Sequence, residues 1–285
     1  MYRTYNSGAS RARSSGRSFS GGRILIAVVF AIFSLISYFG SKSFNPVTQE
    51  DQYVAITPQQ EVALGLQAEP QMIQEFGGLD ASQEAQAFLD QVCDRVIQNS
   101  DAQETEWPFE CHLLADDQTI NAFALPGGPL FITAALYNEL ETEGQLAGIM
   151  AHEIGHVVAR HSAQQMAQTQ LTQGLTGAFV IAAYDPENPN SQYSAQMAML
   201  VGQLVNMKYG RDDELQSDRL GVRFMGQAGY DPHALIGVMQ ILAEASQGGP
   251  PEFFSTHPNP DNRIERIEEA IAEEFPNGVP EGHIP

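Results

Sequence analysis

Residues 148–161 contain the side chains of this sequence that are best suited to chemistry. The stretch reads GIMAHEIGHVVARH and places three histidines and one glutamate among small and apolar residues. His152 and His156 are four positions apart, so on a helix both imidazoles project from one face and can hold one tetrahedral zinc ion. Glu153, the next residue, can reach a water molecule at that ion. The H-E-x-x-H spacing therefore predicts a zinc site with a glutamate as general base.

The alternative is a polar stripe on the solvent side of an ordinary helix. Burial of the stretch is indicated by its apolar neighbours, which are Ile149, Met150, Ile154, Val157 and Val158. Two buried histidines and a glutamate would cost free energy without a metal ion or polar partners. The sequence therefore favours the metal site.

The third histidine of the stretch is predicted not to be a ligand. His161 follows His152 by nine positions, about half a revolution away at roughly 100° per residue, so on a continuous helix it cannot share that face. The extended metzincin pattern would need glycine at position 159 and histidine at 162, where this sequence has Ala159 and Ser162. A third ligand must come from another element.

The best candidate for that ligand lies in RDDELQSDRLG, residues 211–221. On a helix, Glu214 and Asp218 share a face, so Glu214 can bind the ion while Asp218 accepts a hydrogen bond from the outer nitrogen of a ligand histidine. The alternative is a solvated helix start, because Asp212 and Asp213 are also typical of a first turn. Beside the H-E-x-x-H motif, the metal interpretation is preferred.

The elements that must position these residues predict an α+β fold that is mainly α, with a small antiparallel sheet. The predicted helices cover residues 58–76, 82–99, 142–161, 171–183, 195–208, 212–227, 232–246 and 261–274. The predicted strands cover 109–114, 119–125 and 130–133. Thr142 and Gln145 form a capping box at the start of the H-E-x-x-H helix. Pro70 is expected to break or kink the first helix, and 171–183 is expected to be a core or lid helix.

An apolar segment, residues 24–40, is predicted to be a membrane anchor. A cleaved signal peptide, which would give a secreted protein, and a mitochondrial presequence, which would lead to the inner membrane, are the alternatives. Five arginines precede the segment and one lysine, Lys42, follows it, which predicts a cytoplasmic N-terminus and an extracytoplasmic, periplasmic-side domain. The expected organisation is a basic disordered arm (1–23), the anchor (24–40), a linker (41–57) and a zinc metallopeptidase domain (58–285).

Charge and cysteine content narrow the classes of partner. The formal net charge of the 285 residues is −21, and after residue 23 only 9 basic residues face 35 acidic ones, which excludes a nucleic-acid binder. Cys93 and Cys111 are the only cysteines. They form either one disulfide, from a helix to the following strand, or two buried thiols. The sequence does not indicate an oligomeric state.

Four motifs in order along the chain resemble those of the M48 zinc metallopeptidases. They are NAFALPGGPLFIT (121–133), AGIMAHEIGHVVARHS (147–162), RDDELQSDRLG (211–221) and FFSTHPNPDNRIERI (253–267). The resemblance implies a zincin-like fold and one Zn²⁺ per chain, with His152, His156 and Glu214 as ligands, Glu153 as general base and Asp218 beside a ligand histidine. A single hydrophobic anchor resembles the single-pass or secreted quality-control branch of the family.

The same resemblance implies further roles around the cleft. His257 and Arg263 match a motif that contributes catalytic residues, either of which could stabilise the oxyanion of a tetrahedral intermediate. Their alternatives are a plain loop residue and a surface ion pair. The four residues Asn121, Ala122, Phe123 and Ala124 resemble the edge strand that binds substrate through backbone hydrogen bonds, and their alternative is a core strand.

These observations predict a zinc-dependent endopeptidase that hydrolyses peptide bonds of polypeptide substrates, namely misfolded or membrane and envelope proteins. The alternative is a zinc-containing chaperone or assembly factor with little or latent turnover. A third possibility, weaker than both, is a membrane anchor whose zinc only stabilises the fold. Three protein ligands beside an unbound glutamate favour catalysis over a closed four-ligand site.

Overall fold

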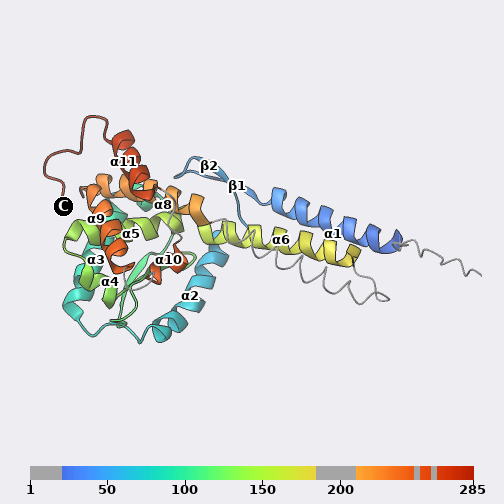
Figure 1. Ribbon diagram of the computed structural model, residues 1–285, viewed down its shortest axis with the longest axis horizontal. Coiled ribbons are helices and arrows are strands. Elements are labelled where there is room, and N and C mark those ends of the chain that lie inside the picture. Colours follow the sequence, from blue (N-terminus) through green and yellow to red (C-terminus); the bar gives the residue numbers. More distant parts are fainter. Residues whose placement is uncertain (1–20, 184–209, 247–250, 258–261) are drawn as a thin grey trace, which may run out of the picture.

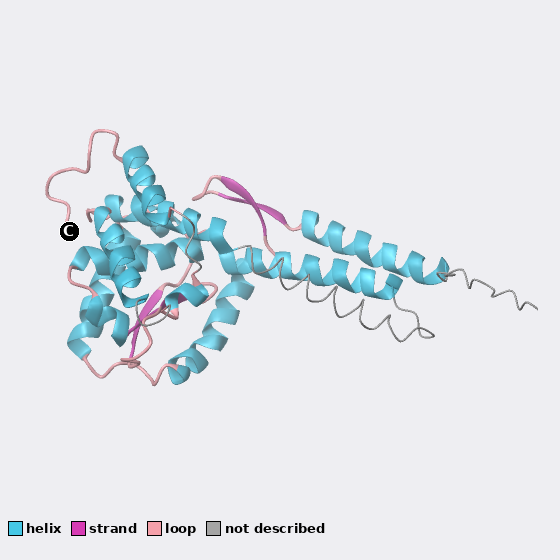
Figure 2. Cartoon of the chain, in the orientation of Figure 1, coloured by secondary structure: helices cyan, strands magenta, loops and turns pink. Residues whose placement is uncertain are grey.

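Helices dominate the chain, and short strands form two small sheets (Figures 1 and 2). The computed structural model describes residues 21–183, 210–246, 251–257 and 262–285. The helices are α1 (Gly21–Gly40), α2 (Pro58–Glu75), α3 (Gln83–Gln98), η1 (Asp101–Glu104, 3-10), α4 (Ala134–Glu139), α5 (Glu143–Val158), α6 (His161–Ala183), α8 (Gly210–Gln227), α9 (His233–Ala245), α10 (Phe253–Thr256) and α11 (Arg263–Glu274). The strands are β1 (Lys42–Asn45), β2 (Glu50–Tyr53), β3 (Glu110–Leu114), β4 (Ala122–Ala124) and β5 (Pro129–Thr133).

The predicted fold class, α+β and mainly α, is confirmed, although several details differ. The short helices α4 and α10 were not predicted, and the expected helix 195–208 lies outside the described residues. Pro70 does not break α2, which is one helix from Pro58 to Glu75. The capping box of Thr142 and Gln145 is present at the start of α5.

Helix α5 lies at the centre of the domain, in contact with α3, α8 and α9. Almost every residue of α5 is buried, because its small and apolar side chains allow neighbours on all sides. Its most extensive contact is with α8. A Cβ atom added to Gly155 would lie 3.2 Å from the Ser217 carbonyl oxygen, and one added to Gly221 would lie 3.4 Å from the His152 nitrogen. These two glycines let the backbones of α5 and α8 cross closely.

The main sheet has the strand order β3-β5-β4 and is mixed, which corrects the predicted antiparallel sheet. Strands β4 and β5 are antiparallel, but β3 and β5 are parallel, with Glu110 opposite Pro129 and Leu114 opposite Thr133. Both β3 and β4 are therefore edge strands. The β3 edge is covered by Gln86 of α3. Its Oε1 accepts a hydrogen bond from the Leu113 nitrogen at 2.9 Å, and its Nε2 donates one to the Cys111 oxygen at 2.8 Å.

The two cysteines, whose state the sequence left open, form a disulfide. It joins Cys93 of α3 to Cys111 of β3, which are 18 positions apart. The bond therefore fixes the edge strand of the sheet to the helix that packs against α5.

Helices α1 and α6 lie side by side and antiparallel, and extend away from the domain (Figure 1). Helix α1 is long and apolar enough to cross a membrane, and little of it is buried. The two helices meet at Gly174, where an added Cβ atom would lie 2.0 Å from the Ser34 hydroxyl. The stretch 171–183 is part of α6 and not a core helix, since Phe179 is 57% exposed.

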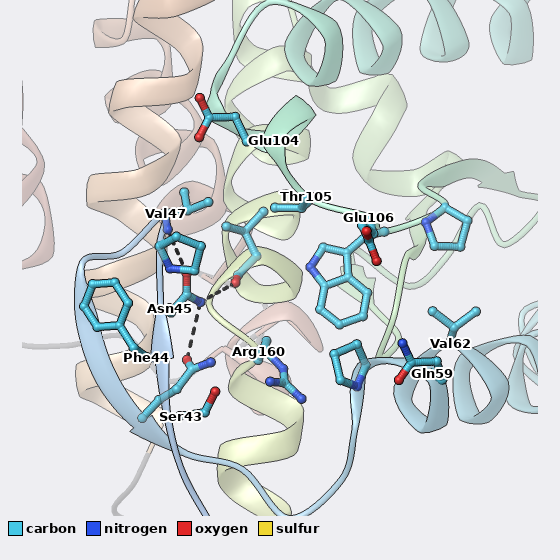
Figure 3. Close-up of a pocket in the computed structure, with 16 residues that line it drawn as sticks. Ser43, Phe44, Asn45, Val47, Gln59, Val62, Glu104, Thr105, Glu106 and Arg160 are labelled. Carbon is cyan, nitrogen blue, oxygen red and sulfur yellow. Dashed lines mark hydrogen bonds between the residues drawn. The ribbon is translucent and has the colours of Figure 1, made fainter.

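A β-hairpin of β1 and β2 occupies the segment that was expected to be a linker. The hairpin is attached to the domain by Asn45, whose Nδ2 donates to the Val158 oxygen at 2.8 Å. A mainly apolar cavity of about 590 Å³ lies between the hairpin, the start of α2 and residues 104–108, with Arg160 in its wall (Figure 3).

Candidate metal centre

The two histidines of the H-E-x-x-H motif face each other on α5, as predicted. Their Nε2 atoms are 3.1 Å apart. His152 is 1% exposed, and the side chain of His156 is 15% exposed. Two neutral imidazole nitrogens at this separation would repel each other if both pointed lone pairs at the gap. A proton or a metal cation between them removes that repulsion.

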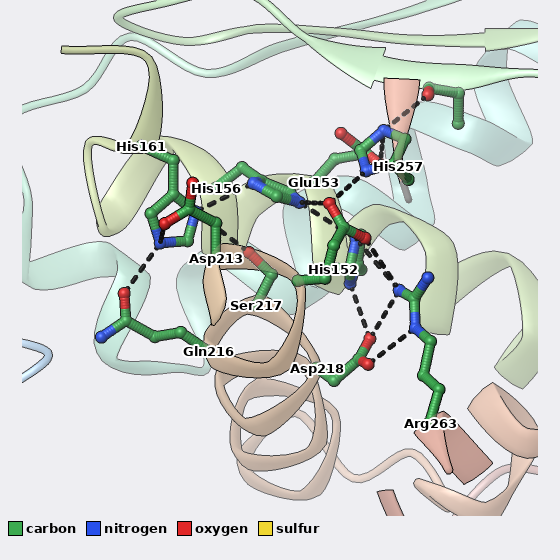
Figure 4. Close-up of polar contacts among 12 residues, drawn as sticks. His152, Glu153, His156, His161, Asp213, Gln216, Ser217, Asp218, His257 and Arg263 are labelled. Atoms are coloured by element: carbon green, nitrogen blue, oxygen red, sulfur yellow. Dashed lines mark hydrogen bonds and ion pairs between the residues drawn. The ribbon is translucent and has the colours of Figure 1, made fainter. Parts of the chain in front are cut away.

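Glu214 reaches the same point from α8. Its Oε2 lies 3.5 Å from His152 Nε2, and its Oε1 lies 3.4 Å from His156 Nε2. Figure 4 labels the two histidines together with Asp218, His257 and Arg263, which surround this point. The close crossing of α5 and α8 at Gly155 brings this carboxylate over the histidine pair. The structure therefore brings the three predicted residues together in one cluster.

His257 of the C-terminal loop completes the cluster. Its Nδ1 lies 3.0 Å from Glu214 Oε1, and its ring is stacked on Phe253 with centroids 4.5 Å apart. One ligand atom each from His152, His156, Glu214 and His257 lies within 4.8 Å of the others. Three imidazoles and one carboxylate form a donor set typical of zinc.

Orphaned oxygen atoms support the fit of a cation at this cluster. Both carboxylate oxygens of Glu153, which is 0% exposed, lack a hydrogen-bond partner among the described residues. Oε2 of Glu214 also accepts no hydrogen bond within that part of the chain, although it is ion-paired with Arg263 Nη2 at 3.2 Å. Buried carboxylate oxygens without partners are costly. A metal ion with its bound water would satisfy them.

Two charged residues, Asp218 and Arg263, surround the cluster and hold its side chains in place. Asp218 Oδ1 lies 2.9 Å from His152 Nδ1, which is the contact that the sequence predicted. Arg263, only 3% exposed, donates from Nε and Nη2 to the two oxygens of Asp218 at 2.8 and 2.9 Å. Its Nη2 also lies 3.2 Å from Glu214 Oε2. Arg263 is therefore part of a buried network and not of a surface ion pair.

Burial and neighbouring charges separate the pKa values of the site. Burial lowers the pKa of His152, but Asp218 and Glu214 outweigh it and raise that pKa to about 9. Burial holds the pKa of His156 well below 6.5. Burial also raises the pKa of Glu153. The pKa of Glu214 is lowered despite its burial, because His257, His152 and His156 surround it.

His161 differs from the prediction, which placed it on the far side of a continuous helix. Helix α5 ends at Val158, Arg160 has a φ of 59°, and α6 starts in a new direction at His161. The His161 ring therefore lies beside the cluster, with Nδ1 2.9 Å from His156 Nδ1 and Nε2 2.7 Å from Gln216 Oε1. It contacts the Nδ1 side of the His156 ring, and it does not belong to the group of four residues that could hold a metal ion.

The four predicted substrate-binding residues do not all face the cleft. Strand β4 is an edge strand, and the Ala122 carbonyl faces His257, whose Nε2 lies 3.2 Å away. The Phe123 ring stacks on Phe131 in the sheet. The Asn121 carbonyl accepts from both the backbone nitrogen and the hydroxyl of Thr133. Backbone pairing with a peptide is thus possible at Ala122.

A helix with the H-E-x-x-H motif, a glutamate from a second helix and an adjacent edge strand together define a metalloendopeptidase of the zincin class. Comparison with known families agrees with this class. Residues 83–271 match the family described as Peptidase family M48. The chain belongs to this family of zinc metallopeptidases.

Individual relatives are similar over part of their length. The beta-barrel assembly-enhancing proteases of Yersinia pestis and Escherichia coli (strain K12) are each 34% identical, over 62% and 58% of this chain. The mitochondrial metalloendopeptidase OMA1 of Schizosaccharomyces pombe is 29% identical over 84% of this chain and 69% of its own length. The chain spans 37% and 35% of the two assembly-enhancing proteases.

Proposed function

We propose that this chain is a zinc-dependent endopeptidase in which His152, His156 and Glu214 hold one Zn²⁺. The observation that carries the proposal is the convergence of their ligand atoms, with that of His257, within 4.8 Å in the protein interior. When bound, zinc supplies a Lewis acid that polarises the scissile carbonyl and makes water acidic near neutral pH.

Glu153 acts as the general base in this proposal. Its carboxylate is buried beside the ligands and has no hydrogen-bond partner among the residues that the structure describes, so it is available to a water molecule. Burial raises its pKa, which makes it a better proton acceptor than an exposed glutamate. It takes the proton of the attacking water and delivers it to the leaving amine.

Asp218 and Arg263 position the ligands. Asp218 orients His152 through its contact with Nδ1, and Arg263 holds Asp218 and Glu214 in place. Arg263 Nη1 lacks a hydrogen-bond partner in the described part of the chain. This nitrogen is the donor that could serve the developing oxyanion, as the sequence suggested for Arg263.

His257 closes the resting enzyme in this proposal. Its Nδ1 lies beside Glu214 and would be a fourth ligand to a bound ion, while its Nε2 faces the Ala122 carbonyl that a peptide would need. The backbone nitrogen of Phe253 also donates to the Ile120 oxygen just before β4. The segment 251–257 therefore covers both the metal position and the edge strand, and it must move before a substrate binds.

The proposed substrates are misfolded proteins of a membrane or envelope. The assembly-enhancing and mitochondrial relatives suggest such compartments by name. Helix α1 supports membrane attachment, because a 20-residue apolar helix with little protein around it needs lipid or another apolar partner. The five arginines among residues 1–23, against one lysine after the apolar segment, support an extracytoplasmic domain. A signal segment and a mitochondrial inner-membrane protein remain the alternatives for α1.

The test of catalysis is Glu153→Gln. The variant should keep the zinc content of the wild type and lose cleavage of an unfolded protein by about 10²- to 10⁴-fold. Glu143→Gln, on the same helix but outside the ligand cluster, is the control. Normal cleavage by Glu153→Gln would refute the base assignment, and absence of stoichiometric zinc from the wild type would refute the metal site. The inactive variant, expressed in its own membrane, should also retain substrates for identification.

The second candidate is a zinc-containing chaperone or assembly factor with little turnover. The observation that favours it is the position of His257 at the fourth ligand site. A permanently closed site would hold polypeptides without cleaving them. The activity of His257→Ala separates a latent peptidase, which would be released, from a holding protein, which would be unchanged.

A further inference from the structure

A second group of possible metal ligands lies on the main sheet, apart from the α5 histidines. Glu110 and His112 are two positions apart on β3, so their side chains project from the same face. Glu69 reaches that face from α2. One ligand atom from each of the three lies within 4.8 Å of the others.

The imidazole of His112 is buried and held in a fixed orientation. His112 is 7% exposed, and its ring is stacked on Phe131 with centroids 5.1 Å apart. Its Nε2 lies 3.3 Å from Glu69 Oε1 but makes no hydrogen bond to any residue within the described ranges. A buried nitrogen in this state costs free energy. The atom is available to a ligand that approaches between the two carboxylates.

Close packing at Gly65 explains why Glu69 reaches this face. A Cβ atom added to Gly65 would lie 2.1 Å from the Pro126 oxygen and 3.2 Å from Pro129 Cδ, so only glycine allows α2 this near to β5. Pro129 is the register partner of Glu110. Glu69 is one helical turn after Gly65 and therefore points to the same side. The backbone itself brings the carboxylate to β3.

We propose that Glu69, Glu110 and His112 form a second divalent metal site, with zinc as the ion that fits best. One imidazole nitrogen and two carboxylates are ligands typical of zinc, and the two negative charges match the cation. Glu110 is exposed, which leaves room for water in the remaining positions. Calcium and magnesium prefer all-oxygen sites, so the imidazole disfavours them. The ion would tie α2 to the edge strand β3.

The test is zinc stoichiometry of the full chain after metal removal. Wild type should bind two Zn²⁺ per chain in calorimetric titration. Glu69→Gln/Glu110→Gln should bind one, with the affinity of the second ion reduced at least tenfold and peptide cleavage retained. The control, Glu75→Gln/Glu106→Gln, removes the same charge from α2 and from the segment before β3, and should still bind two. Zinc beyond one equivalent should raise the melting temperature of wild type and control only.

Three results would overturn the second site. The first is binding of only one zinc ion per chain by the wild type. The second is loss of the second zinc ion from the control variant as well. The third is loss of both zinc ions from the Glu69→Gln/Glu110→Gln variant. A single equivalent would mean that His112 and Glu69 are only an ion pair. The catalytic proposal fails separately, because Glu153→Gln and the activity of the one-zinc variant report on the α5 site alone.

Discussion

Replacement of His257 by alanine tests whether the loop closes the active site or assists the reaction. Three polar contacts and one stacking contact hold the His257 ring in place: Nδ1 is 3.0 Å from Glu214 Oε1, Nε2 is 3.2 Å from the Ala122 oxygen and 3.5 Å from Glu153 Oε1, and the ring lies 4.5 Å from that of Phe253. A hydrogen bond to a charged group contributes about 1.5–3 kcal/mol and a neutral one about 0.5–1.5 kcal/mol. Ring stacking adds about 0.5–1.5 kcal/mol.

The opened loop regains hydrogen bonds with water, so the net free energy of opening lies near the lower end of this sum, at about 3 kcal/mol. Since about 1.4 kcal/mol corresponds to a tenfold ratio, roughly one molecule in a hundred is open at rest. His257→Ala should therefore raise kcat/KM for an unfolded or fluorogenic peptide substrate by up to about 100-fold at saturating zinc. The control is His233→Ala, which removes an exposed histidine of α9.

A decrease in kcat/KM on replacement of His257 would refute this reasoning. If His257 stabilised the oxyanion, its loss would lower the rate by about 10²- to 10³-fold. A decrease of that size, with zinc content equal to that of the wild type, would mean that His257 is a catalytic residue and not a closing one. No change in rate, with cleavage absent in both proteins, would favour the holding function.

Three further predictions concern the support of the site and the stability of the fold. Asp218→Asn should weaken zinc binding by about 10- to 100-fold in a chelator competition assay, because Asp218 Oδ1 lies 2.9 Å from a ligand histidine. Replacement of Cys93 and Cys111 by serine should lower the free energy of unfolding by about 3 kcal/mol in denaturant titrations, because the bond closes a loop of 18 positions. Burial raises the pKa of Glu61 above 4.5, against the opposing effect of Arg160. The folded state then binds this proton more tightly than the unfolded state, so the contribution to stability is complete below pH 4.5 and is lost as the pH rises through the folded pKa. Glu61→Gln should flatten that decline in unfolding measurements made from pH 4.5 upward.

Each of these three has a result that contradicts it. Unaltered zinc affinity in Asp218→Asn would mean that the contact with the histidine does not orient it. A serine double variant that unfolds with the same midpoint and slope would mean that the disulfide does not restrict the unfolded chain. Stability curves of Glu61→Gln and wild type that stay parallel over pH would place the pKa of Glu61 at its ordinary value.

The ligand cluster was predictable because its spacing follows helix geometry. His152 and His156 are one turn apart, and Glu214 and Asp218 repeat that spacing on α8. The sequence could place each pair on a face without knowing how the helices cross. The crossing itself depends on Gly155 and Gly221, whose close contacts are a property of the assembled fold and have no local signature.

Two errors arose where the chain changes direction without an obvious signal. Arg160 adopts a φ of 59°, which is normally the role of glycine or asparagine, so nothing in the sequence marked the end of α5. His161 was consequently placed half a turn away from the cluster it contacts. The parallel pairing of β3 and β5 was missed for a related reason, because consecutive strands with short connections usually pair as antiparallel neighbours.

The antiparallel packing of α6 against α1 fixes the distance between the candidate metal centre and the end of α1. Ala167 of α6 lines the same hollow as Ser41, at the end of α1. His161, beside the candidate zinc ligands, precedes Ala167 by six positions, or about 9 Å along the helix. If α1 spans a bilayer, a peptide would need roughly three extended residues to reach the candidate metal centre from the lipid surface. In that arrangement, the site would be within reach of peptide bonds just outside a membrane segment.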